Sequence, residues 1–153
     1  MYIELEPIGV VVGGRVEPVD DAWDTEVCEV VLDATRFDES AVAGLDTFSH
    51  VEVVYRFHLV DDEAIAIGAR HPRGRVDWPA VGIFAQRGRV RPNRLGVSVC
   101  RVLGVEGLRV RVQGLDAIDG SPVLDLKPYL SGFAPRGARR EPAWAHEIMA
   151  GYW

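Results

Sequence analysis

Valine is the residue that most constrains the fold of this chain. The sequence contains 23 valines among its 153 residues, and a β-branched side chain loses freedom in a helix but packs well on a pleated sheet. Within residues 51–57 and 108–113, apolar side chains mostly alternate with polar ones. A period of two is typical of a strand with one buried face. The sequence therefore predicts a mainly β protein.

Short strands separated by turns of glycine and proline are predicted along most of the chain. They cover residues 3–12, 27–32, 51–57, 81–85, 97–103, 108–112 and 123–126. Helical signal is confined to residues 38–45, with Asp38 as N-cap, and to residues 142–149, with proline in the first turn. This pattern indicates an antiparallel β-barrel with short helices and a C-terminal helical tail. We expect one barrel domain at residues 1–135, and a tail at residues 136–153 that packs on the barrel or on a partner subunit.

Charge is distributed unevenly along the chain. A formal net charge of −6 argues against a general nucleic-acid coat protein, whose phosphate contacts require an excess of basic residues. Residues 70–94, however, carry seven arginines and one aspartate, a net +6, so the remaining residues sum to −12. Such a block fits the docking of an anionic substrate such as an RNA backbone. Pairing of these arginines with the chain's own acidic residues is the alternative.

Cysteine, histidine and glycine content excludes several kinds of site. Cys28 and Cys100 are too few for a disulfide framework or a thiolate metal site, and their apolar surroundings predict buried, reduced thiols. The four histidines are scattered, so no metal site is predicted. No strand is followed by the glycine spacing of a dinucleotide-binding turn. Without an apolar membrane span or the features of a signal peptide, the chain is expected to be cytoplasmic.

Three longer motifs together resemble one known family. They are residues 44–50 (GLDTFSH) with 56–58 (RFH), residues 81–87 (VGIFAQR) with 91–98 (RPNRLGVS), and residues 114–129 (GLDAIDGSPVLDLKPY). Occurring in this order, and preceded by residues 7–9 (PIG), they make the chain similar to the TsaA/TrmO-like family from about residue 3 to residue 135.

The resemblance implies a β-barrel methyltransferase that works as a homodimer and binds S-adenosylmethionine without a Rossmann sheet. The family's characterised reaction methylates the N6 nitrogen of threonylcarbamoyl-adenosine beside the tRNA anticodon, so tRNA is the expected substrate. Two alternatives stay open. One is a methyltransferase of the same fold that acts on a small molecule or on another modified base. The other is a non-catalytic protein that binds S-adenosylmethionine.

The resemblance also implies a set of cofactor-binding residues. The turn Asp116-Ala117-Ile118-Asp119 would line the pocket, although the adjoining Asp-Gly-Ser-Pro is also ordinary β-turn chemistry. Arg87 would hold the cofactor or a substrate anion in a bidentate manner, with a solvated surface arginine as the alternative. Val97 would form a wall of the pocket, and a loop before the second strand would contribute Trp23 and Asp24.

His58 follows the long predicted strand, and Leu59 is its neighbour in the expected pocket. Histidine readily exchanges a proton near neutral pH, so His58 is a candidate proton acceptor or cofactor contact, whereas a histidine at a strand end is also commonly a structural hydrogen-bonding residue. The catalytic residue is otherwise unknown. Arg91 and Asn93, in an Arg-Pro-Asn turn, are candidates for substrate binding.

The middle motif departs from the family's usual sequence at three positions. Gln86, Gly88 and Arg94 stand where well-known tRNA enzymes have threonine, serine and proline. Because these residues belong to the substrate-facing part of the motif, the departures motivate the alternative in which the methyl acceptor is not tRNA.

Overall fold

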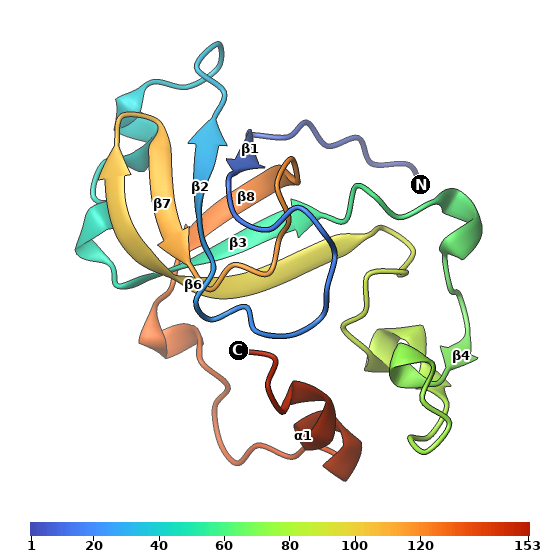
Figure 1. Ribbon diagram of the computed structural model, residues 1–153. Coiled ribbons are helices and arrows are strands. Elements are labelled where there is room, and N and C mark those ends of the chain that lie inside the picture. Colours follow the sequence, from blue (N-terminus) through green and yellow to red (C-terminus); the bar gives the residue numbers. More distant parts are fainter.

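Six strands close into one antiparallel barrel in the computed structural model, which describes residues 1–153 (Figure 1). Around the barrel the strands follow the order β1, β2, β7, β6, β3 and β8, and β8 returns to β1. Their bounds are β1 Gly9–Val12, β2 Val27–Leu32, β3 His50–Arg56, β6 Leu95–Glu106, β7 Arg109–Gln113 and β8 Pro122–Pro128. The predicted fold class, an antiparallel β-barrel with short helices and a C-terminal helix, is confirmed.

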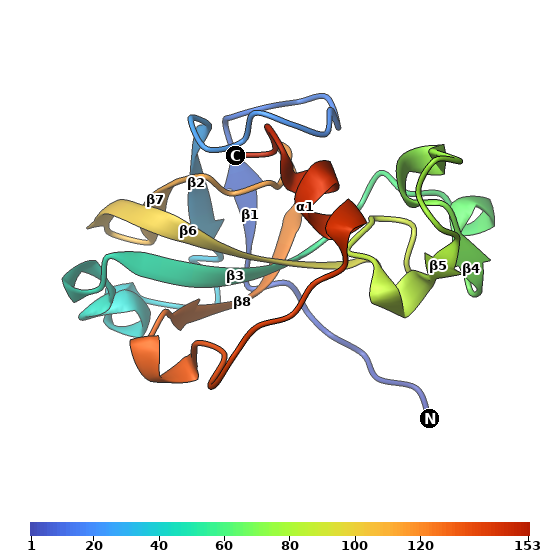
Figure 2. The same cartoon turned by 90° about the horizontal axis from the view of Figure 1, so that it is seen from below.

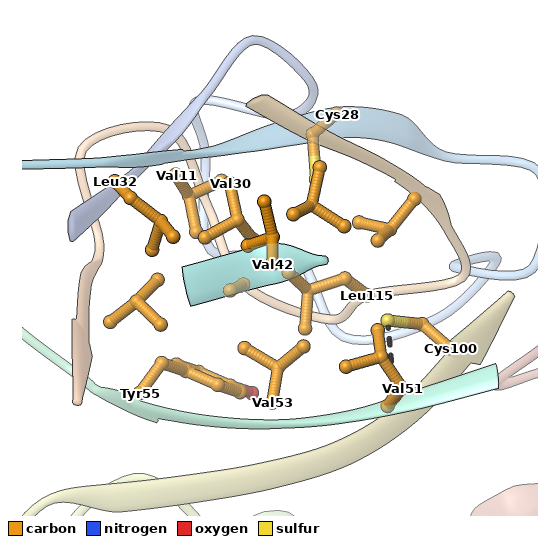
Figure 3. Packing of buried hydrophobic residues seen from close by; sticks show 14 residues of the cluster. Val11, Cys28, Val30, Leu32, Val42, Val51, Val53, Tyr55, Cys100 and Leu115 are labelled. Carbon is orange, nitrogen blue, oxygen red and sulfur yellow. Dashed lines mark hydrogen bonds between the residues drawn. The ribbon is translucent and has the colours of Figure 1, made fainter. Parts of the chain in front are cut away.

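The barrel forms because alternate side chains of each strand point inward. In β2 every second residue is buried, and the register of β2 against β7 places Val30 opposite Val110 and Cys28 opposite Val112. Figure 3 shows the resulting interior, a cluster of 14 buried residues that is mostly valine. Burial of apolar area on this scale is the main force that holds the strands together.

The remaining elements are short. β4 (Ala69–Arg70) and β5 (Val81–Gly82) form a separate two-stranded sheet, and α1 (Ala143–Met149) is the C-terminal helix. Single 3-10 turns make up the rest: η1 Glu39–Val42, η2 Leu45–Thr47, η3 Asp62–Ala64, η4 Pro72–Gly74, η5 Ile83–Ala85 and η6 Ser131–Phe133. Figure 1 shows β4 and the turns around it to one side of the barrel, and Figure 2 shows α1 beside the loop that joins β1 to β2.

Four of the predicted strands are wrong in extent by more than one residue at an end. Two are too short, since residues 97–103 lie within the longer β6 and residues 123–126 within β8. The other two are too long. The strand predicted at residues 3–12 begins only at Gly9, because the backbone of the first six residues finds no ladder partner and their side chains are exposed. The strand predicted at residues 81–85 ends at Gly82, since Ile83 turns inward and its carbonyl accepts from the Gln86 amide to form η5. Asp38 caps η1 as predicted, accepting from the Ser40 backbone amide.

Both cysteines are buried and free, as predicted. Burial raises the pKa of Cys28 and that of Cys100 to about 12 each. The thiols are therefore protonated members of the core and poor nucleophiles. None of the helices has both the length and the apolar character that crossing a membrane requires.

Candidate functional site

A half-buried carboxylate, that of Asp116, lies at the centre of the candidate site. Its Oδ1 accepts from the hydroxyls of Tyr55, at 2.9 Å, and of Ser98, and its Oδ2 accepts from the hydroxyl of Tyr152. These partners come from β3, β6 and the C-terminal end of the chain. Hydrogen bonds to an ionised acceptor are the strong ones, so the three hydroxyls fix both the position and the orientation of the carboxylate.

The two tyrosines are suited to act as donors. Burial raises the pKa of Tyr55 well above its ordinary value, and the Asp116 charge raises it further. Burial followed by the Asp116 charge also raises the pKa of Tyr152, while the nearby Arg87 charge opposes the change. Both hydroxyls therefore keep their protons at neutral pH.

Tyr55 reaches Asp116 because β6 carries a glycine beneath its ring. A β-carbon at Gly96 would lie 2.4 Å from Cζ of Tyr55, closer than real contacts allow. The register pairs Gly96 directly with Tyr55 across β3 and β6. A glycine in a strand often marks such a close approach.

The turn at residues 116–120 is anchored at its far end to the loop after β1. Asp119 Oδ1 accepts from the Gly13 amide at 2.8 Å, and the Asp119 amide donates to the Arg15 carbonyl at 2.8 Å. The Asp119 carboxylate thus has a structural partner already and is exposed on its other side. Ala117 faces the barrel core, so only its backbone is available to a ligand, and Ile118 is half-buried.

His58 lies against the same turn. A β-carbon at Gly120 would be 3.5 Å from His58 Nε2. The Nδ1 atom of His58 is buried and has no hydrogen-bond partner. The ring thus borders the turn through Nε2, whereas Nδ1 is a buried polar atom without a partner, which is rare in folded proteins. Its neighbour Leu59 is 61% exposed and thus lies on the surface.

The middle motif is folded largely onto itself. Arg87 donates to the Val97 carbonyl at 2.6 Å and remains exposed, whereas Arg91 donates to the Gln86 carbonyl at 2.8 Å. Val97 is half-buried on β6, and Asn93 is exposed without a side-chain hydrogen bond. Arg87 and Arg91 therefore both brace backbone carbonyls of their own motif.

The two residues predicted in the loop before β2 have different surroundings. Trp23 is buried, with the guanidinium of Arg15 3.8 Å above its ring. Arg15 also donates to the carbonyls of Asp21 and Ala22 and so holds the loop closed. Asp24 is partly exposed and pairs with Arg101 at 2.7 Å.

The C-terminal segment covers this end of the barrel. The amides of Ala22 and Trp23 donate to the carbonyls of Gly151 (3.0 Å) and Tyr152 (2.9 Å). On α1, Glu147 accepts from the indole of Trp78 at 2.6 Å. Figure 2 shows the C-terminus next to the loop between β1 and β2. Residues from four distant parts of the chain therefore meet around Asp116.

The arginine-rich block at residues 70–94 is largely engaged within the chain. Ion pairs join Arg73 to Asp21, Arg75 to Asp77 and Arg94 to Asp62. These contacts favour the alternative reading, in which the block pairs with acidic residues of its own chain. Three arginines elsewhere, at positions 136, 139 and 140, are exposed and make no ion pair or side-chain hydrogen bond.

Sequence patterns missed several residues of the site. Tyr55, Ser98 and Tyr152 were not predicted because nothing local marks them, since their partner Asp116 lies 61, 18 and 36 residues away. Arg15 was missed as well. The glycine at position 96 was the one available signal, because a glycine inside a valine-rich strand indicates a large neighbour.

Two surface depressions lie away from these residues. One, of about 500 Å³, is lined by Phe48 and residues 129–133, and the other, of about 790 Å³, lies at the turn between β6 and β7. Neither includes a candidate residue. The structure contains no group of three or more His, Cys, Asp or Glu side chains arranged to hold a metal ion.

Comparison with known proteins places these features in a family. A family model described as the tRNA-methyltransferase O N-terminal domain matches residues 17–134. Among solved structures, the chain resembles TrmO from Pseudomonas aeruginosa with a TM-score of 0.72 and 30% identity, covering 91% of this chain and 61% of that one.

Two curated relatives illustrate the range of matches. A protein of Methanothermobacter thermautotrophicus named probable S-adenosyl-L-methionine-binding protein is 35% identical over 133 residues, covering 84% of this chain and 91% of the relative. The tRNA (adenine(37)-N6)-methyltransferase of Mus musculus is 36% identical over 95 residues, covering 62% of this chain but only 22% of the mouse protein. The chain thus spans nearly the whole archaeal relative and a small part of the mouse one.

Proposed function

Because the chain belongs to the tRNA-methyltransferase O N-terminal domain family, we propose that it is an S-adenosylmethionine-dependent methyltransferase. The acceptor we propose is the N6 nitrogen of threonylcarbamoyl-adenosine in tRNA. The observation that carries the proposal is the motif residue Asp116 held by three hydroxyls, with His58 against the same turn, in a chain of this family.

The residues at this end suit S-adenosylmethionine. Recognition of its amino-acid part needs an acceptor for the ammonium and a cation for the carboxylate, which Asp116 Oδ2 and Arg87 supply. The unpartnered Nδ1 of His58 supplies a further polar contact, and the backbone of the turn at residues 116–119 supplies hydrogen-bonding groups. We assign Asp119, Ile118, Val97, Trp23 and the backbone of Ala117 to the wall of the same pocket, with Leu59 and Asp24 at its edge.

The bound cofactor would supply a methyl group already activated by the sulfonium centre. The protein then needs to align the acceptor and to receive the proton that the N6 nitrogen loses. We assign the second task to His58, because its ring borders the turn and one of its nitrogens is unsatisfied. We assign Asn93, which is exposed and unpaired, to the substrate, with Arg91 holding the loop that carries it.

Charge also supports a polyanionic substrate, although from a part of the chain other than the one first expected. Three of the seven arginines at residues 70–94 form ion pairs, which leaves less free charge there than the sequence indicates. In contrast, Arg136, Arg139 and Arg140 are exposed in the segment before α1. Free guanidinium groups on an exposed segment are typical phosphate contacts. A tRNA acceptor would place the enzyme in the cytoplasm.

The test is a methyl-transfer assay with purified protein, labelled S-adenosylmethionine and total tRNA, followed by nucleoside digestion. We expect methylated threonylcarbamoyl-adenosine in the digest, and His58→Gln should lower kcat more than it changes KM for the cofactor. Transfer to tRNA at another nucleoside would overturn the acceptor but leave the enzyme class intact.

A second candidate is supported by the archaeal relative, whose name states cofactor binding and no reaction. Under this reading the chain binds S-adenosylmethionine without transferring its methyl group. The departures of the middle motif, which motivated an acceptor other than tRNA, have a role in the fold instead. The Gln86 amide donates to the carbonyls of Arg70 and Val81, and Arg94 pairs with Asp62, so both serve the fold of the loop. Cofactor binding with no product on any tRNA would favour the second candidate.

We also propose that the chain forms a homodimer. In support, the first five residues carry exposed apolar side chains, among them Tyr2, Ile3 and Leu5. Light scattering coupled to size exclusion tests this directly, since a mass of about 34 kDa is expected from the 16.9 kDa chain.

A further inference from the structure

The C-terminal strap, residues 143–153, contacts two of the segments that carry candidate cofactor residues, the loop at residues 22–23 and the turn that begins at Asp116. Its carbonyls accept from the backbone of Ala22 and Trp23, Glu147 accepts from Trp78, and the Tyr152 hydroxyl donates to Asp116. Figure 2 shows the strap lying across the barrel end beside the loop that follows β1. These contacts are spread over the whole strap rather than confined to one residue.

We propose that Tyr152 is a positioning residue of the cofactor site, and that the strap forms the outer wall of the pocket. This rests on the function proposed above, since it concerns how the Asp116 carboxylate is presented to S-adenosylmethionine. Tyr152 acts through Asp116 and is not assigned a contact with the reacting atoms.

The geometry separates the roles of the two oxygens of Asp116. Oδ1 is held from inside the barrel by Tyr55 and Ser98, whereas Oδ2 has only Tyr152 as a partner. A carboxylate oxygen accepts about two hydrogen bonds. Oδ1 is therefore saturated by the barrel, and Oδ2 keeps one position for a further donor, such as the ammonium group of the cofactor.

Removal of the Tyr152 hydroxyl would leave that position poorly defined. The carboxylate would then be held only through Oδ1 and would be freer to turn about its Cβ–Cγ bond. Water would enter where the hydroxyl now lies, because Tyr152 is half-buried.

The first experiment is isothermal calorimetry of the full chain with S-adenosylmethionine. Tyr152→Phe removes only the hydroxyl, and we expect its Kd to rise about tenfold, which is the worth of one hydrogen bond to a charged acceptor. Tyr2→Phe is the matched control, since Tyr2 is 89% exposed and makes no hydrogen bond. In methyl transfer, KM for the cofactor should rise by a similar factor while kcat changes less than about threefold.

A second variant keeps the test decisive if Tyr152→Phe disturbs folding. Ending the chain at Ala150 removes Tyr152 together with both backbone contacts to the Trp23 loop. We expect a loss of affinity at least as large, with an unchanged circular-dichroism spectrum of the barrel. Normal affinity in the shortened chain would overturn the role of the strap.

Hydrogen exchange distinguishes a strap that forms a wall of the pocket from a strap that must move away before the cofactor binds. The Ala22 and Trp23 amides donate to the strap, so they should exchange more slowly when S-adenosylmethionine is bound. Faster exchange in the bound state would overturn the proposal, because the strap would then compete with the cofactor. If the wild-type chain does not bind the cofactor, the proposed function is wrong; if it binds and Tyr152→Phe binds equally well, only the role of Tyr152 is wrong.

Discussion

The barrel and the segment between β3 and β6 are held together by different kinds of hydrogen bond. In the barrel, strands pair along continuous backbone ladders, and the interior is filled by apolar side chains. Residues 57–94 contain only the two-residue strands β4 and β5 and three-residue turns. There, long polar side chains replace the ladder: Gln86 donates to two carbonyls of that segment, and Arg91 donates to a third.

This difference shows how arginine content can mislead. A cluster of arginines in an acidic chain indicates an anionic partner, but in a loop with few ladders the same side chains are the donors that satisfy backbone carbonyls and nearby carboxylates. Arg73 and Arg94 have become structural in this way. Arginines that are available to an anionic partner are therefore expected in segments whose backbone does not need such side-chain donors.

The largest expected effect lies inside the barrel. Gly96→Ala should destabilise the fold by about 2–3 kcal/mol, because its β-carbon would collide with the ring of Tyr55. Gly104→Ala on the same strand is the matched control, since a β-carbon there meets nothing within 4 Å. Urea unfolding measures both free energies. Equal effects of the two substitutions would contradict the close approach of Gly96 to Tyr55.

A second prediction concerns the buried thiols and alkaline pH. The pKa of Cys28 and that of Cys100 rise from the ordinary 9.0 to about 12 in the folded state. Between these pH values the unfolded chain releases the protons while the folded chain keeps them. Stability is therefore fully present below pH 9 and falls as the pH rises, by at most about 1.4 kcal/mol per thiol and pH unit.

Urea unfolding between pH 8 and pH 10.5 measures this slope. The double variant Cys28→Ala, Cys100→Ala should lose stability overall but show a shallower pH dependence. A slope unchanged by the double substitution would assign the pH dependence to other groups, such as Tyr55.

A third, smaller effect is expected in the segment outside the barrel. Gln86→Leu removes the donor for the carbonyls of Arg70 and Val81 and should cost about 1–2 kcal/mol. Amides of residues 66–94 should exchange faster, while those of the barrel strands stay protected. Gln113→Leu is the matched control, because that amide braces Asp24 instead. Uniformly faster exchange in both regions would contradict the separation between them.

The smallest effect on stability should come from the free arginines. Replacing Arg136, Arg139 and Arg140 by alanine should change the free energy of unfolding by less than about 0.5 kcal/mol. If these side chains contact phosphates, the slope of log affinity for tRNA against log salt should decrease by about 2–3. A control that replaces Arg73 and Arg75, which are ion-paired, should leave the slope nearly unchanged; the reverse outcome would return the tRNA surface to residues 70–94.

Much of the barrel could be predicted from the sequence, because alternation along a strand is a local property. The strand at residues 27–32 was predicted with correct bounds, and residues 51–57 and 108–112 differ from β3 and β7 by only one residue at each end. The strand at residues 81–85 was overextended because a short apolar run does not distinguish a strand from a buried turn. The strand predicted at residues 3–12 was also overextended, since the apolar character of the exposed residues at its start does not supply a strand for them to pair with.

The candidate site was predicted only in its motif residues. The turn at residues 116–119 and Arg87 were found because they belong to recognisable motifs, and the structure joins Asp116 of that turn to Tyr152. Whether they bind S-adenosylmethionine is still a prediction. The sequence could not show that Asp24 pairs with Arg101 or that Leu59 is exposed, since both depend on the folded structure.

The sequence by itself determined that this protein is a valine-lined antiparallel barrel of a known family, because side-chain alternation and motif order are both written along the chain. Only the tertiary structure decided that Tyr55, Ser98 and Tyr152 share one carboxylate, since those hydrogen bonds exist only after the barrel closes and the C-terminal strap returns across it. It also decided which arginines are free, because charge pairing depends on distance in space and not on spacing in sequence.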